Sequence, residues 1–143
     1  MCTATDCYSM TCTTTATAAP DWAANGATRA VGDPMLDVDA VNGPGPETVT
    51  VVDPPDGVYL AGAYVAAGGT LLNPTAVTVT VSIDGDALRT SDTRLLFEGE
   101  LWAPFAITVT PEAFTVSRYN GCSQGFACLV PVASGPELFQ CSP

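Results

Sequence analysis

The sequence predicts an all-β protein, built as an antiparallel β-sandwich of jelly-roll or immunoglobulin-like (Ig-like) topology with disulfide-stapled termini. Apolar and hydroxyl side chains alternate with a period of two through the middle of the chain. Turn signals separate these runs at roughly eight to twelve residues, and no window has the period of a long amphipathic helix. With 143 residues, the chain has room for one domain with a sizeable core.

The expected strands follow one another closely along the chain. We predict them at residues 48–52, 58–67, 76–83, 87–90, 93–97, 101–105 and 106–110, with a short further strand at 114–116. The run 76–83 is the clearest, because four aliphatic side chains alternate there with hydroxyl side chains. Asp84-Gly85 predicts a hairpin turn, since glycine takes the positive φ that the primed turns require. Residues 53–57, Asp-Pro-Pro-Asp-Gly, and residues 98–100, Glu-Gly-Glu, predict two more turns.

The chain divides into three expected segments. Residues 1–20 form a cysteine- and threonine-rich segment, residues 21–110 contain the sandwich, and residues 111–143 form a cysteine-containing extension. Trp22, near the start of the middle segment, is expected either to stack on a sugar ring or to anchor the core.

All cysteines lie near the two ends of the chain. They are Cys2, Cys7, Cys12, Cys122, Cys128 and Cys141. An even number predicts disulfides formed in an oxidising compartment, and therefore a secreted or cell-surface protein. A zinc-thiolate site is disfavoured, because the chain has neither a Cys-x-x-Cys pair nor a histidine. The pairing stays open between local bridges, Cys7 with Cys12 and Cys122 with Cys128, and a bridge from one terminus to the other.

If the protein is secreted, we expect the chain to be the mature form or to begin with an added start methionine. Met1 is followed by Cys2 and polar residues, so no signal peptide is visible. No apolar run approaches the roughly 20 residues that a membrane-spanning helix needs, so no membrane insertion is expected.

The charge balance limits the partners. Fifteen acidic residues face four arginines, lysine and histidine are absent, and the formal net charge is −11. Nucleic acids and anionic membranes are therefore not expected as partners, because both attract basic residues. Cations, neutral glycans and other proteins remain.

The missing residue types also limit catalysis. Without histidine or lysine, the chain has no Ser-His-Asp triad, Schiff-base lysine or P-loop. A glycosidase would need two carboxylates, drawn from Asp37, Asp39, Glu47, Glu98 and Glu100. No feature marks one of these acids as buried and proton-holding, so a carboxylate-based hydrolase is the least favoured function and we expect no enzyme.

The densest polar stretch is residues 33–47, with four carboxylates, an Asn-Gly turn signal and three prolines. Calcium takes six to eight oxygen ligands, and several unpaired carboxylates repel one another unless a cation neutralises them. We therefore predict a calcium site from Asp33, Asp37, Asp39, Asn42 and Glu47. Asp37 and Asp39 would project from the same face of an extended strand.

Two considerations limit the calcium prediction. The EF-hand pattern fails, because Val41 and Asn42 occupy loop positions five and six when counted from Asp37. The alternative is that these acids accept hydrogen bonds from nearby N–H groups in a turn.

Residues 36–47, Leu-Asp-Val-Asp-Ala-Val-Asn-Gly-Pro-Gly-Pro-Glu, resemble the core motif of the YfaP-like family of bacterial secreted domains, common in myxobacterial surface proteins. The same family pattern matches Asp6-Cys7-Tyr8, Asp21-Trp22, Asp56-Gly57-Val58-Tyr59 and Ala61-Gly62-Ala63-Tyr64. The resemblance implies a β-sandwich module of a secreted or surface protein, with no established catalytic activity.

The chain departs from this family at two points. Ala40 replaces a second adjacent acid, which removes one possible ligand. Family members also carry an Asp-x-Asp-Leu-His strand ahead of the Asp-Cys-Tyr element, and the sequence begins after that position. Either the domain is truncated or its first strands come from elsewhere, and a sheet that lacks an edge strand could be completed by another copy or another protein.

The leading expectation is an extracellular, non-catalytic binding or adhesion module stabilised by calcium. The alternative is a structural subunit of a surface layer or extracellular filament that assembles through strand edges.

Overall fold

The structure is a computed structural model of the chain and describes residues 7, 11–13, 19–27, 29–40, 45–65, 74–97 and 100–119. These residues form seven strands and no helix. The strands are β1 (Pro34–Val38), β2 (Thr48–Val51), β3 (Gly57–Tyr64), β4 (Thr75–Ile83), β5 (Leu88–Leu96), β6 (Leu101–Val109) and β7 (Phe114–Arg118). All ladders between them are antiparallel, so the all-β prediction is confirmed.

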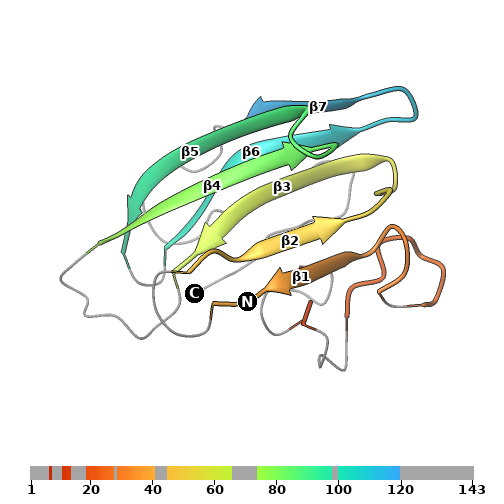
Figure 1. The fold of residues 1–143 in the computed structure, drawn as a ribbon, viewed down its shortest axis with the longest axis horizontal. Helices are drawn as coiled ribbons and strands as arrows, with labels where there is room; N and C mark the ends of the chain where they lie inside the picture. The colour runs from red at the N-terminus through yellow and green to blue at the C-terminus, as the bar shows by residue number, and fades with distance from the viewer. Residues whose placement is uncertain are drawn as a thin grey trace.

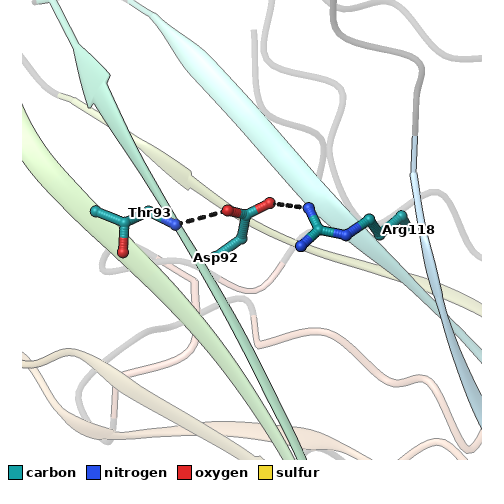
Figure 2. A network of polar contacts seen from close by, with 3 residues as sticks. All are labelled: Asp92, Thr93 and Arg118. Atoms are coloured by element: carbon teal, nitrogen blue, oxygen red, sulfur yellow. Dashed lines mark hydrogen bonds and ion pairs between the residues drawn. The ribbon is translucent and has the colours of Figure 1, made fainter.

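The strands form three hydrogen-bonded groups. β1 pairs with β2, β4 pairs with β5, and β6 lies between β3 and β7. The β4–β5 hairpin passes close to β3 and β6 (Figure 1). It is also tied to β7, because Arg118 forms an ion pair with Asp92 of β5, whose other oxygen accepts the Thr93 N–H at 2.9 Å (Figure 2).

The β4–β5 hairpin follows the predicted alternation. The two strands pair without a break from Thr75 opposite Leu96 to Ile83 opposite Leu88. The aliphatic side chains of β4 face inward, with Val81 buried, and its hydroxyl side chains face solvent. The four residues between the strands, 84–87, form the turn; Asp84, Gly85 and Asp86 have φ of 51°, 60° and 81°, so the turn contains the predicted Asp84-Gly85 pair.

Two predicted strand pairs are single strands. β5 runs unbroken through Ser91 and Asp92, and β6 runs unbroken through Phe105 and Ala106. The polar Ser-Asp pair does not interrupt β5, because the Asp92 carboxylate finds partners in Arg118 and the Thr93 N–H. β6 continues because it is the central strand of its sheet, with partners on both sides.

A bulge accommodates the proline in β6. The register runs from Ala61 opposite Phe105 to Ala63 opposite Trp102, so β6 has one residue more than β3 in this interval. Proline lacks an N–H and is tolerated within sheets at such bulges, where Pro104 lies. Gly62 faces the bulge, and a Cβ there would lie 2.5 Å from the Trp102 carbonyl oxygen.

β7 extends the sheet of β3 and β6. The sequence predicted a short strand at 114–116, and the structure has a strand of five residues paired with β6. Beyond its end, the Tyr119 N–H donates to the Pro104 carbonyl at 2.7 Å. The 110/111 boundary predicted from the sequence therefore falls in the turn of the β6–β7 hairpin.

Seven of the buried apolar residues form two clusters that share Trp22. One cluster consists of Tyr59, Leu60, Ala103 and Val109. The other consists of Cys7, Cys12 and Leu36, with Cys7 and Cys12 joined by a disulfide. Trp22 packs against both, and its ring lies 5.2 Å from that of Tyr59. Of the two roles considered for Trp22, the structure shows the core anchor.

Candidate metal site at the β1–β2 hairpin

The β1–β2 hairpin carries three of the predicted metal ligands. Val38 pairs with Thr48, and the residues that adjoin this last pair, Asp39 and Glu47, are close enough for their charges to interact. The two arms of the connecting loop also approach each other, because a Cβ on Gly45 would lie 2.5 Å from the Ala40 Cβ. Asp39 and Glu47 therefore lie next to the close approach of Ala40 and Gly45.

Asp37 occupies a bulge in β1. Leu36 pairs with Val49 and Val38 pairs with Thr48, which leaves Asp37 as the extra residue. Its side chain is exposed, as is that of Val38, so the strict in-and-out alternation ends here. The sequence expectation that Asp37 and Asp39 share a face assumed a regular strand, and the bulge removes that regularity.

Two acidic side chains, Asp39 and Glu47, lie close together at the end of the β1–β2 hairpin. Partial burial of the carboxyl group raises the pKa of Glu47, and the negative charge of Asp39 raises it further. The described part of the chain contains four arginines, two of which form ion pairs elsewhere: Arg89 with Asp86 of the β4–β5 turn, and Arg118 with Asp92 of β5. Asp39 raises the pKa of Glu47 because the two carboxylates are near enough to repel each other.

Asp33 lies apart from this group and has a different environment. It is 2 % exposed, its Oδ1 accepts the Ala23 N–H at 3.1 Å, and its Oδ2 accepts the Ala30 N–H at 3.0 Å. It lies six positions before Asp39, which is about 20 Å along an extended chain. Asp33 therefore fixes the loop that precedes β1, as in the alternative considered for these acids.

The remaining predicted ligand, Asn42, lies outside the described residues. Within the described ranges, no group of three or more histidine, cysteine, aspartate or glutamate side chains is close enough to hold a metal ion. A calcium shell at this hairpin would thus require oxygens from the 41–44 loop as well as Asp37, Asp39 and Glu47.

Two other acids, Glu98 and Glu100, were considered for catalysis. Glu98 lies outside the described residues. Glu100 stabilises the turn before β6, because its Oε2 accepts the Phe97 N–H at 2.8 Å and its own N–H donates to the Phe97 carbonyl at 3.1 Å.

Only one of the predicted disulfides falls within the described residues. The Cys7–Cys12 bridge has an S–S distance of 2.07 Å, and Cys12 is almost fully buried. Cys2, Cys122, Cys128 and Cys141 lie outside the described residues. Among the residues described, no helix is long and apolar enough to cross a membrane.

Sequence reasoning missed the second capping carboxylate of the loop before β1. Asp21 accepts the N–H groups of Asn25 at 3.1 Å and Gly26 at 2.8 Å. The spacing Asp-x-x-x-Asn-Gly is a turn signal that could have indicated this role.

Comparison with family models, with curated proteins and with solved structures found no match to this chain.

Proposed function

We propose that the protein is an extracellular, non-catalytic binding or adhesion module whose β1–β2 hairpin binds calcium through Asp37, Asp39, Glu47 and oxygens of the 41–44 loop. The observation that carries the metal proposal is the proximity of Asp39 and Glu47 next to the last pair of the β1–β2 ladder. Two carboxylates that repel each other lower the stability of the folded protein, and a divalent cation between them would reverse this effect.

The strand pairing supports an Ig-like sandwich as the finer fold. In constant-type Ig domains, the third, sixth and seventh strands form one sheet, and the fourth pairs with the fifth in the other. The chain has the same β3–β6–β7 order and the same β1–β2 and β4–β5 pairs. A ladder between the β1–β2 and β4–β5 pairs would complete the second sheet, and none is formed among the described residues. This order favours the Ig-like alternative over a jelly roll.

The proposed location and relatives have separate support. A buried disulfide between Cys7 and Cys12 fits a secreted or surface protein, since such bridges persist in oxidising compartments. The Leu36 to Glu47 motif supports a relationship to the YfaP-like family, whose resemblance points to the same location. The charge of −11 supports a protein or a neutral glycan as the partner rather than a polyanion.

Thermal melting with and without calcium tests the metal proposal. Because a ligand that binds only the folded state stabilises it, millimolar CaCl2 should raise the melting temperature by about 5 °C or more relative to EDTA. Asp39→Asn and Glu47→Gln should each abolish most of this rise. Asp84→Asn, an exposed acid in the β4–β5 turn, is the matched control and should retain it. A melting temperature that calcium leaves unchanged would remove the metal claim.

A panel of neutral glycans and cell-surface proteins, assayed in calcium and in EDTA, tests the binding role. A binding module should retain a ligand from the panel without altering it. Release of new reducing ends from a glycan, lost in Glu47→Gln or Glu100→Gln, would instead support the hydrolase alternative.

A further inference from the structure

The edge of β4 that faces away from β5 has none of the features that usually prevent an edge strand from pairing with another strand. All nine residues pair with β5, and no other described strand shares a ladder with β4. The strand contains no charged residue, proline, glycine or bulge. Long uncharged edges of this kind are templates for pairing with another strand.

Each of the other five outer strands has a feature, absent from β4, that limits its pairing with a further strand. β1 begins at Pro34, contains the Asp37 bulge and has its Leu36 N–H bonded to the Cys12 carbonyl. β2 has four residues, and β3 contains Gly62 opposite the β6 bulge. β5 carries three charged side chains, and the five-residue β7 ends at Arg118. β3 runs near β4 but shares no ladder with it (Figure 1).

The β4 sequence is also complementary to itself. Read outward from Val79, Thr78 matches Thr80 and Val77 matches Val81, and these are followed by Ala76 with Ser82 and Thr75 with Ile83. Antiparallel pairing of two such strands about Val79 would place threonine beside threonine on the solvent face and valine beside valine on the inner face. Cross-strand pairs of β-branched and hydroxyl residues stabilise sheets.

We propose that β4 is a self-association edge, at which the β4 strands of two copies of this chain pair antiparallel about a two-fold axis at Val79. The pairing converts two two-stranded hairpins into one four-stranded sheet of order β5–β4–β4–β5. Two-stranded ladders are marginally stable alone, and a third and fourth strand add cooperative support. A two-fold axis uses the same surface on both copies, as the self-complementary sequence allows.

Charge supports a second copy at this edge. Each chain carries a net charge of −11, so two copies repel unless they meet where charge is absent. β4 offers nine residues without a charged side chain. Because salt screens the remaining long-range repulsion, the dimer should become tighter as ionic strength rises.

Sedimentation equilibrium of the full chain over a range of concentrations tests the proposal. The wild type should pass from monomer to dimer, and Thr80→Glu should raise the dimer dissociation constant about tenfold or more, because two-fold symmetry introduces the new charge twice. Ser82→Glu, exposed on the same strand, should act in the same direction. Thr115→Glu, exposed on β7, is the matched control and should leave dimerisation unchanged.

Two further measurements show whether each variant is folded and whether β4 itself forms the dimer contact. Circular dichroism of each variant monitors folding, and backbone amides of 75–83 should gain protection from hydrogen exchange as the wild-type concentration rises. The dimer should form equally in CaCl2 and in EDTA, which separates this proposal from the calcium site. A wild type that stays monomeric at all concentrations, or a dimer that both β4 variants leave intact, would overturn the proposal.

Discussion

Glu47 shows at the scale of single residues how the hairpin tip responds to pH. Its folded-state pKa is raised, so the folded protein favours the protonated acid. Without calcium, the stability associated with this group is present below the ordinary carboxyl pKa and lost as the pH rises through the raised value.

Glu47→Gln should therefore have opposite effects in EDTA and in calcium. At pH 7 in EDTA the variant should melt slightly higher than the wild type, by no more than about 5 °C because Glu47 is exposed, and at pH 4 the two should converge. In calcium the variant should melt lower, since it lacks a ligand. Glu112→Gln, in the exposed β6–β7 turn, is the control and should change neither melt. If Glu47→Gln melts lower than the wild type in EDTA at pH 7, repulsion between Asp39 and Glu47 does not destabilise the folded protein.

Individual acids were the least predictable part of the site. The sequence grouped Asp33 with the other carboxylates of 33–47, whereas the structure buries it against the N–H groups of Ala23 and Ala30. Those partners are backbone groups of alanines, which leave no side-chain signal in the sequence. Asp39 and Glu47 were both among the predicted ligands, but the sequence paired Asp39 with Asp37 rather than with Glu47, because it assumed a regular strand.

Whole elements were predictable where one physical signal dominated. β4 and its turn follow from alternation and a glycine with positive φ, and both are confirmed. β1 was not predicted as a strand, because Pro34 and the acids that follow it interrupt the alternation of apolar and polar residues. Its pairing with β2 is visible only in the structure. β6 was divided in two because β3, one of the two partners that keep it continuous, comes from a distant part of the chain.

The β3–β6 bulge supports a prediction about this central element. In Gly62→Ala, the new Cβ would lie 2.5 Å from the Trp102 carbonyl oxygen and 2.9 Å from the Ala103 Cα. Backbone cannot yield as a flexible side chain can, so the bulge must shift. We expect a loss of about 1–3 kcal/mol in the free energy of unfolding, measured by urea denaturation. A variant as stable as the wild type would show that the two strands do not approach this closely.

At the scale of the whole molecule, cooperativity depends on how the N-terminal disulfide segment attaches to the sheets. Trp22 is the described side chain that packs against both the Cys7–Cys12–Leu36 cluster and the Tyr59 cluster. The sequence left its role open between sugar stacking and core packing, because an Asp-Trp pair carries no information about contacts made more than thirty residues away.

Trp22→Ala should therefore loosen the N-terminal cluster as well as lower global stability. Removing a large, partly buried aromatic ring should cost about 2–4 kcal/mol in the free energy of unfolding. Phe114→Ala removes a more exposed ring at the start of β7 and should cost less than about 1.5 kcal/mol. Hydrogen exchange supplies the second measurement, because the Leu36 N–H donates to the Cys12 carbonyl at 3.2 Å and reports directly on this attachment. In Trp22→Ala this amide should exchange faster than the amides of β6, whereas in Phe114→Ala the two should keep their wild-type order. Equal effects of the two variants on Leu36 would mean that the disulfide segment is held by contacts other than Trp22.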